Sequence, residues 1–473
     1  MPTSQTPFRI DASLFKAYDI RGIVERSLTR EAAGAIGAAL GSEAHVREIK
    51  EIAVGRDGRL SGPWLRDALI DGIRSAGVGV VDIGQVATPI LYFATYHLAT
   101  GSGVEITGSH NPPDYNGMKF VLGGASLHGE GLQVLRRRIE QGDLYRAPSP
   151  GALRNADVAH AYRERITSDV QLSRPMRIVI DCGNGVAGAS AGALYRALGC
   201  EVTELFCEVD GTFPNHHPDP AHAENLQDLI GAVQRTGAEV GLAFDGDGDR
   251  LGVVTKNCRI IYPDRQIMLF ARDVLAHRPG AEIIFDVKCT RHIAPWVRAH
   301  GGLPTMWRTG HSLIKARLRD SGAAFAGEMS GHLFFNDRWY GFDDGLYAGA
   351  RLLEILSRSA DPSAVLEALP DATCTPELQV ATAEGENVRV VERLRQLAQD
   401  GGAGGCFGQA REIITIDGVR VEYADGFGLA RPSNTTPVIV LRFEADNDAA
   451  MARIQADFRR AFLAVAPAAT LPF

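Results

Sequence analysis

A βα pattern that repeats three times is the feature that most constrains how this chain can fold. Short apolar runs typical of strands alternate with helical segments, and each block ends in a loop rich in polar residues. Such alternation is typical of α/β domains, in which helices cover the faces of a sheet. The chain has 473 residues, more than one hydrophobic core normally supports. We therefore predict three related α/β domains with mixed sheets.

After about residue 370 the pattern changes to mostly strands, ending in an expected helix over 449–464. Asp417-Gly418 lies between two apolar runs and predicts a tight hairpin, because both residues tolerate positive φ angles. We therefore expect a smaller α+β domain at the C-terminus. The predicted domains span 1–155, 156–257, 258–370 and 371–473, with a hinge-like linker near Asp371 and a surface loop at 401–405. The expected strands span 52–54, 78–81, 103–106, 177–181, 201–206, 239–244, 282–287, 305–308, 323–326, 377–381, 411–416, 419–423 and 436–443, and the helices between them span 64–75 and 225–235.

Three aspartates at alternate positions, Asp245, Asp247 and Asp249, are separated by glycines and followed by Arg250. Carboxylate oxygens are hard ligands suited to Mg²⁺ or Ca²⁺, and glycine lets a loop curl tightly. The spacing does not fit an EF-hand calcium loop, which needs a glycine and a glutamate at fixed later positions. A magnesium site with positions left for phosphate oxygens is the first hypothesis, and a solvated acidic turn is the alternative.

A candidate nucleophile lies in residues 107–112, Thr-Gly-Ser-His-Asn-Pro, directly after the expected strand 103–106. This places the Ser109 hydroxyl at the carboxyl end of a strand, where open α/β sheets bind their ligands. His110 adds a hydrogen-bond donor, and Lys119 follows shortly afterwards. The same residue types also favour a simple turn. Together with the aspartate loop, the serine favours a phosphoryl-transfer site.

Two further loops complete a set of four: residues 327–332, Gly-Glu-Met-Ser-Gly-His, and residues 431–436, Arg-Pro-Ser-Asn-Thr-Thr. In this order, the four segments resemble the phosphoserine, metal, sugar-binding and phosphate-clamp loops of the α-D-phosphohexomutases, closest to the bifunctional phosphomannomutase/phosphoglucomutase branch. Pro432 departs from the family, which usually has a small residue there. Met329 resembles the glucose/mannose branch, since phosphoglucosamine mutases usually have glutamine there, and a phosphoglucosamine mutase is the nearest alternative.

The resemblance implies reversible transfer of a phosphoryl group between the 1 and 6 positions of glucose and mannose phosphates. Ser109 would carry the group, and a hexose 1,6-bisphosphate would be both intermediate and activator. Mg²⁺ would be held by the three aspartates and an oxygen of phosphorylated Ser109, where it would offset transition-state charge. A proton acceptor is also needed, and His332, Lys119 and Arg21 are candidates that the sequence does not rank. The resemblance also assigns catalytic roles to His110 and Arg250, and substrate binding to Tyr18, Lys288, His311, Glu328, Ser330, Arg431, Ser433, Asn434 and Thr435.

Two other motifs allow different interpretations. Residues 183–188, Gly-Asn-Gly-Val-Ala-Gly, satisfy the G-x-G-x-x-G dinucleotide pattern after a strand, so an NAD-binding oxidoreductase is an alternative from another class. A metal-binding regulatory module is the non-enzyme alternative. We prefer the interpretation that these glycines allow close strand–helix packing. Residues 56–59, Arg-Asp-Gly-Arg, either bind phosphate or cap the following helix, and the sequence does not choose between these.

Composition and net charge limit the kinds of ligand that this chain can bind and the compartment in which we expect it. The net charge of −8 argues against general nucleic-acid binding, so local basic groups must attract an anionic substrate. The 7 cysteines include no Cys-x-x-Cys pair, which argues against a disulfide framework or structural zinc and predicts reduced, mostly buried thiols. The N-terminus lacks signal-peptide features, and no run of about 18 apolar residues occurs. We expect a cytoplasmic enzyme without membrane partners, with a monomer favoured.

Overall fold

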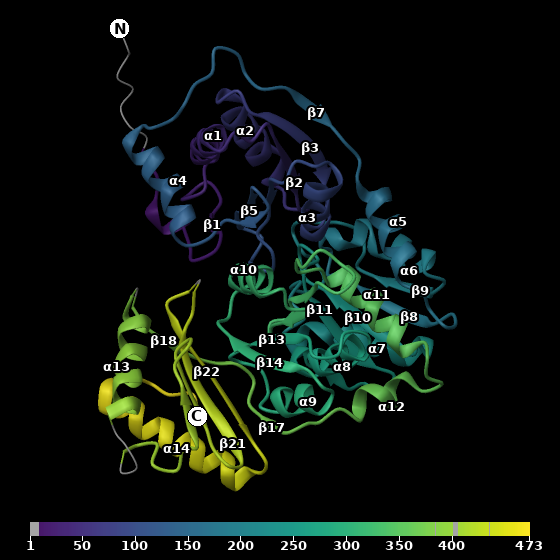
Figure 1. The fold of residues 1–473 in the computed structure, drawn as a ribbon, viewed down its shortest axis with the longest axis vertical. Coiled ribbons are helices and arrows are strands. Elements are labelled where there is room, and N and C mark those ends of the chain that lie inside the picture. Colours follow the sequence, from purple (N-terminus) through teal and green to yellow (C-terminus); the bar gives the residue numbers. More distant parts are fainter. Residues whose placement is uncertain (1–8, 384, 401–404, 435) are drawn as a thin grey trace. The chain divides into compact units, whose positions relative to one another are not determined.

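The computed structural model describes residues 9–383, 385–400, 405–434 and 436–473, which form two compact units (Figure 1). The first unit spans Met1–Gln266 and His311–Ala368, and the second spans Ile267–Gly310 and Leu369–Phe473. None of the helices in the described ranges combines the length and apolar character that crossing a membrane requires. The domain boundaries and the hinge proposed from the sequence stay predictions.

The first unit begins with a seven-stranded mixed sheet in the order β1-β5-β4-β2-β3-β7, with β6 paired to β5. Strand β2 is parallel to β3 and β4, whereas β5 is antiparallel to both β4 and β1. The chain reverses direction between β4 and β5, and the predicted serine loop is that connection. The strands are β1 (Ile20–Ile23), β2 (Glu51–Arg56), β3 (Gly79–Gln85), β4 (Gly103–Ile106), β5 (Tyr115–Leu122), β6 (Ala125–Ser126) and β7 (Leu153–Asn155).

Helices α1 (Arg30–Val46) and α2 (Gly62–Ser75) pack closely together in this first domain. Thr29 caps α1 by accepting a hydrogen bond from the Ala32 amide at 3.2 Å. Glycine permits the close approach, since a Cβ at Gly37 would lie 2.2 Å from the Leu69 carbonyl oxygen on α2. The remaining elements before the second sheet are η1 (Ala12–Leu14), α3 (Thr88–His97), α4 (Glu130–Gln141) and α5 (Ala159–Asp169).

A second sheet, in the order β12-β11-β10-β8-β9, also belongs to the first unit. Strand β8 is parallel to β9 and β10, and β11 turns back antiparallel to β10. All five residues of β10 are buried, as expected for a central strand with both faces covered. The aspartate loop is the turn between β10 and β11. These elements are β8 (Arg177–Asp181), η2 (Val186–Ala189), α6 (Ala191–Ala197), β9 (Glu201–Leu205), η3 (Ala223–Leu226), α7 (Gln227–Thr236), β10 (Val240–Phe244), β11 (Leu251–Thr255) and β12 (Ile260–Ile261).

The rest of the first unit contains the predicted sugar-binding loop, which joins two short antiparallel strands, β15 and β16. Helix α11 follows and is buried along its whole length. Asp344 caps it by accepting a hydrogen bond from the Tyr347 amide at 2.8 Å. The elements are α10 (His311–Ser321), β15 (Phe325–Gly327), β16 (Leu333–Phe335), α11 (Gly345–Leu356) and α12 (Pro362–Glu367).

The chain enters the second unit within α8 (Pro263–His277), and the parallel pair β13 and β14 follows. The C-terminal part is a six-stranded sheet whose pairings are antiparallel, with helices α13 and α14 packed on it (yellow-green to yellow in Figure 1). This confirms the predicted α+β character. The elements are β13 (Glu282–Asp286), α9 (Ile293–Ala299), β14 (Leu303–Trp307), β17 (Thr373–Cys374), β18 (Leu378–Ala381), α13 (Glu386–Asp400), β19 (Glu412–Ile414), β20 (Val419–Glu422), β21 (Gly426–Pro432), β22 (Val438–Ala445) and α14 (Asp448–Val465).

Candidate active site

Ser109 lies in the turn between β4 and β5 with a positive φ of 48°, an uncommon conformation for a residue other than glycine. It is 2% exposed. Its Oγ donates to Oδ2 of Asp245 at 3.1 Å and lies 3.2 Å from Nδ1 of His110. The hydroxyl of the predicted nucleophile therefore faces the first aspartate of the metal loop.

A buried arginine holds the serine loop in this shape. Arg59, 1% exposed, donates from its guanidinium to the backbone carbonyls of Ser109 (2.8 Å) and Pro112 (2.6 Å), as well as to those of Asn111 and Tyr115. Asp57 accepts a hydrogen bond from the Gly108 amide at 3.0 Å. The segment 56–59, which the sequence left open between phosphate binding and helix capping, thus fixes the backbone around Ser109.

The three predicted metal ligands, Asp245, Asp247 and Asp249, are each 0% exposed, and each offers an oxygen within 4.8 Å of the others. The loop is tight because a Cβ at Gly246 would lie 2.3 Å from the Ser109 carbonyl oxygen. Among the described residues, Oδ1 of Asp247 and Oδ1 of Asp249 have no hydrogen-bond donor. Buried carboxylate oxygens without donors fit a hard cation such as Mg²⁺.

Lys119 supplies part of the compensating charge, with Nζ at 2.7 Å from Asp247 Oδ2 and 2.6 Å from Asp249 Oδ2. Burial acts to raise the pKa of Asp247, but the Lys119 ammonium outweighs it and holds that pKa below its ordinary value. Burial and the two neighbouring carboxylates raise the pKa of Asp245 well above its ordinary value. The raised pKa of Asp245 reflects the mutual repulsion of the three buried carboxylates, which a bound cation would relieve.

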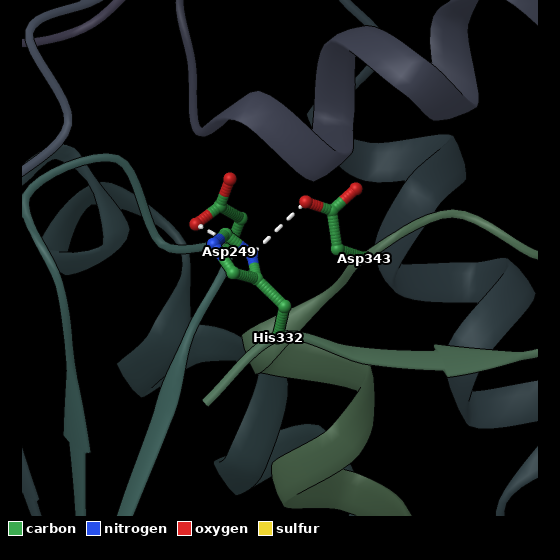
Figure 2. A group of neighbouring side chains, drawn as sticks. All are labelled: Asp249, His332 and Asp343. Atoms are coloured by element: carbon green, nitrogen blue, oxygen red, sulfur yellow. Dashed lines mark ion pairs between the residues drawn. The ribbon is translucent and has the colours of Figure 1, made fainter. Parts of the chain in front are cut away.

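A second group of buried side chains, Asp249, His332 and Asp343, shares Asp249 with the metal loop (Figure 2). Nδ1 of His332 is 3.0 Å from Oδ2 of Asp343 and 3.5 Å from Oδ1 of Asp249. Nε of Arg250 donates to Nε2 of His332 at 3.1 Å. Since an arginine can only donate, Nε2 is an acceptor and the ring proton of a neutral His332 lies on Nδ1, toward Asp343.

Asp343 is also 0% exposed and connects to two residues of α10. Its Oδ1 accepts from Nζ of Lys315 at 2.7 Å, and its Oδ2 lies 3.6 Å from Nδ1 of His311. Burial acts to raise the pKa of Asp343, but Lys315 holds it well below the ordinary value. The ionised carboxylate therefore faces the Nδ1–H edge of His332.

Hydrogen bonds within residues 327–332 hold the sugar-binding loop in its shape. The Glu328 amide donates to the His332 carbonyl at 2.9 Å, and Ser330 Oγ donates to Glu328 Oε2 at 3.3 Å.

Two further predicted site residues lie near these loops. Nη1 of Arg21, on β1, donates to Asn111 of the serine loop at 2.7 Å. The ring of Tyr18 lies edge-on to that of His311, with centroids 5.0 Å apart. The first unit therefore contains thirteen predicted site residues: Tyr18, Arg21, Ser109, His110, Lys119, Asp245, Asp247, Asp249, Arg250, His311, Glu328, Ser330 and His332.

The other described site residues belong to the second unit. Arg431, on β21, donates from Nε to Asp417 Oδ2 at 3.0 Å. Asn434 donates to the Thr309 carbonyl oxygen at 3.3 Å, and Ser433 Oγ lies 2.9 Å from Thr436 Oγ1. Nζ of Lys288 lies 2.5 Å from Oε1 of Glu377. Thr435, also predicted to bind substrate, lies outside the described residues.

The glycines at 183–188 pack against neighbouring backbone. A Cβ at Gly185 would lie 2.9 Å from the Gly246 Cα, and one at Gly188 would lie 2.1 Å from the Cys207 carbonyl oxygen. The segment therefore needs glycine for close packing, but against the metal loop and the backbone after β9 rather than between a strand and a helix, as the sequence had suggested.

Comparison with known proteins decides the family. Four models match in order: phosphoglucomutase/phosphomannomutase alpha/beta/alpha domains I, II and III at residues 12–146, 159–258 and 262–372, and the C-terminal domain at 377–461. This chain belongs to the phosphoglucomutase/phosphomannomutase family. The family resemblance and the predicted fold class are thereby confirmed.

Members of this family from several bacteria match nearly the whole chain. A phosphoglucomutase of Neisseria gonorrhoeae is 57% identical over 451 residues, which cover 95% of this chain and 96% of that protein. A phosphomannomutase/phosphoglucomutase of Pseudomonas aeruginosa strain PAO1 is 52% identical and covers 100% of both chains. The crystal structure of a family protein from Burkholderia thailandensis matches with a TM-score of 0.92 and 57% identity, covering 98% of this chain and 100% of that one.

Proposed function

We propose that this family member moves a phosphoryl group between the 1 and 6 positions of glucose and mannose phosphates, with Ser109 as the carrier. The chain is a phosphohexomutase, an isomerase of hexose phosphates, as its identity of 52–57% to phosphoglucomutases and phosphomannomutase/phosphoglucomutases indicates. The single observation that carries the proposed mechanism is the Ser109 hydroxyl, which faces Asp245 at 3.1 Å at the rim of a buried aspartate cluster.

The family depends on a metal ion, and the buried aspartates fit one. Asp245, Asp247 and Asp249, with an oxygen of phosphorylated Ser109, would hold Mg²⁺. When bound, the ion would neutralise charge on the transferring phosphoryl group. Lys119 and Arg250 add fixed positive charge beside it, since Arg250 lies 3.7 Å from Asp245. A hexose 1,6-bisphosphate would activate the enzyme by phosphorylating Ser109.

The reaction would run in two half-reactions. Phosphorylated Ser109 gives its phosphoryl group to the free hydroxyl of a hexose monophosphate, which forms the 1,6-bisphosphate. After the sugar presents its other end, Ser109 takes back the second phosphate and releases the isomer. Arg59 and Asp57 support both steps because they fix the Ser109 backbone, so the carrier keeps its place while the substrate changes ends.

The substrate hydroxyl needs a proton acceptor, and His332 is the favoured one of the three candidates. Lys119 already donates to two aspartates, and Arg21 is a guanidinium that does not lose its proton. His332 would take the proton at Nε2, which accepts a hydrogen bond from Arg250 Nε at 3.1 Å and must exchange that donor for the substrate hydroxyl, while Nδ1 faces Asp343 at 3.0 Å. Asp343 would therefore hold the ring and stabilise the imidazolium that forms.

Substrate contacts follow from the family resemblance. Glu328 and Ser330 would bind sugar hydroxyls that both substrate orientations share. Arg431 would pair with the phosphate that does not react, since its planar fork matches two phosphate oxygens. Lys288, His311, Tyr18, Ser433, Asn434 and Thr435 would complete the contacts. We also propose that the enzyme is cytoplasmic and favour a monomer. Light scattering would test the oligomeric state.

A coupled assay with glucose 1-phosphate, mannose 1-phosphate and glucosamine 1-phosphate, each with its bisphosphate activator, tests the substrate. We expect turnover of the glucose and mannose phosphates, with the glucosamine phosphate much slower. Turnover of glucosamine 1-phosphate above both others would instead identify a phosphoglucosamine mutase. NAD titration followed by fluorescence is expected to give no saturable change.

A further inference from the structure

Two cysteines that the proposed reaction does not use lie against each other beside the metal loop. Sγ of Cys207 is 3.4 Å from Sγ of Cys182, although 25 positions separate them in the sequence. Cys182 is fully buried, whereas Cys207 is half-exposed. The thiols are therefore in contact, and one of the two is accessible from solvent.

The backbone holds this pair in place. Cys182 follows β8 and Cys207 follows β9, the parallel neighbour of β8. The Cys182 amide donates to the Leu205 carbonyl at 3.2 Å, and the Asn184 amide donates to the Phe206 carbonyl at 2.8 Å. Gly188 leaves no space for a side chain against the Cys207 backbone. The two sulfurs meet because the strand ends are fixed in register, and a disulfide requires them to approach from 3.4 Å to a bonded distance of about 2.05 Å.

We propose that Cys182 and Cys207 form an oxidative modification site, at which hydrogen peroxide converts the two thiols into a reversible internal disulfide. The Cys207 thiolate attacks one peroxide oxygen, the O–O bond breaks, and the departing hydroxide takes up a proton to become water. Sulfur of Cys182 then attacks the Cys207 sulfenic acid, the S–O bond breaks, and water leaves with the Cys182 proton. The pair loses two electrons and the peroxide gains them.

The different surroundings of the Cys182 and Cys207 thiols set the order in which the two react. The hydrogen bond with Cys207, together with burial, holds the pKa of the Cys182 thiol well above its ordinary value. Cys182 therefore stays protonated, and the accessible Cys207 reacts first. Cys182 then acts as the resolving thiol, because it already lies in contact with the Cys207 sulfur.

The pair is connected to the metal loop by a short path. The Gly185 amide donates to the Cys182 carbonyl at 2.7 Å, and the Val186 amide donates to the Gly246 carbonyl at 3.1 Å. Gly246 separates two of the proposed metal ligands. A bond that pulls Cys182 toward Cys207 would shift this segment, so oxidation should raise the Mg²⁺ concentration for half-maximal activity by roughly 10-fold. This consequence, unlike the disulfide itself, rests on the proposed function.

Mass spectrometry of the full-length enzyme treated with hydrogen peroxide tests the proposal without reference to activity. We expect the intact protein to lose two hydrogen atoms, non-reduced peptides to link Cys182 with Cys207, and dithiothreitol to reverse both changes. Cys207→Ser should abolish the link, whereas the matched control Cys258→Ser, which removes another half-exposed thiol, should preserve it.

A second variant tests the order of attack, and its thermal unfolding temperature shows whether the substitution at buried Cys182 preserves the fold. In Cys182→Ala the resolving thiol is gone, so we expect the Cys207 sulfenic acid to persist and to react with dimedone at Cys207. Oxidation of Cys207 to sulfinic acid in the wild type without a link to Cys182 would overturn the proposal, as would oxidation of other cysteines before this pair. A disulfide that leaves the Mg²⁺ requirement unchanged would refute the connection to the metal loop.

Discussion

The group around Ser109 in the first unit and the group around Arg431 in the second unit are built differently. Ser109 is 2% exposed and the three aspartates are 0% exposed, and buried side chains such as Arg59 and Lys119 fix them. Arg431 is also buried, but Ser433 and Asn434 are only partly buried, and Asn434 donates to the Thr309 carbonyl oxygen, 125 positions away in the sequence. Under the proposed function, the first group would be preorganised for chemistry and the second would present donors to the substrate phosphate. Substitutions in the two groups should therefore change different kinetic parameters.

The largest effect is expected for Ser109→Ala, which removes the proposed phosphoryl carrier. Turnover should fall by several orders of magnitude, since no other group takes the carrier role. The thermal unfolding temperature should stay close to that of the wild type, because only one hydroxyl is lost. Steady-state kinetics with calorimetry checks both, and turnover within tenfold of wild type would remove Ser109 from the carrier role.

Asp247→Asn should give the next largest loss. One anionic ligand becomes neutral while Lys119 keeps its charge, so bound Mg²⁺ is less well held. We expect a loss of about 3 to 4 kcal/mol, on the order of 100- to 1000-fold in kcat/KM, with a higher Mg²⁺ requirement. Titration of activity with Mg²⁺ measures this. Full activity of the chelator-treated wild type would exclude a metal from the mechanism.

Arg431→Ala probes the second group and should act mainly on KM. Loss of a charge-assisted pair with the distal phosphate costs about 2 to 4 kcal/mol, roughly 30- to 1000-fold in kcat/KM. The loss should be equal for glucose and mannose phosphates, because both share that phosphate. Arg389→Ala, an exposed arginine on α13, is the matched control and should leave both parameters unchanged. A loss confined to kcat would contradict the proposed contrast between the groups.

The smallest of these effects is expected for Asp343→Asn, which keeps the shape but removes the charge facing His332. We predict a fall of about 10- to 100-fold in kcat with KM nearly unchanged. Asp344→Asn is the matched control, since Asp344 is equally buried but accepts hydrogen bonds from Tyr162 and the Tyr347 amide. The control should lower stability while kcat is retained. Equal kcat losses in both variants would indicate a structural role for Asp343.

The sequence predicted the elements of the site whose chemistry lies in contiguous residues. The serine and aspartate loops follow strands β4 and β10, and their polar residues are adjacent, so spacing alone indicates a site. Arg59 and Asp343 were missed as supporting residues, because their roles arise only when distant segments pack together. No pattern in the sequence marks Asp343 as a site residue. Its partners Lys315 and His332 come from different segments of the chain. Strands β11 and β12 were also not predicted, although the apolar run 251–254 offered a signal.

The contact between two cysteines likewise could not be predicted from the sequence. Spacing alone predicted reduced and mostly buried thiols, because no Cys-x-x-Cys pair exists, but only three of the seven, Cys182, Cys200 and Cys289, are buried. The contact between Cys182 and Cys207 depends on the pairing of β8 with β9, which sequence spacing does not reveal. The surface loop expected at 401–405 falls mostly outside the described residues.

The central claim, that Ser109 carries the phosphoryl group, is tested most directly by mass spectrometry of the enzyme after treatment with glucose 1,6-bisphosphate. The account predicts that the wild type gains one phosphoryl group, that the modified peptide carries it on Ser109, and that addition of a hexose monophosphate removes it. Ser109→Ala should gain none. A wild type that never becomes phosphorylated, or an alanine variant that is phosphorylated to the same extent, would contradict the claim.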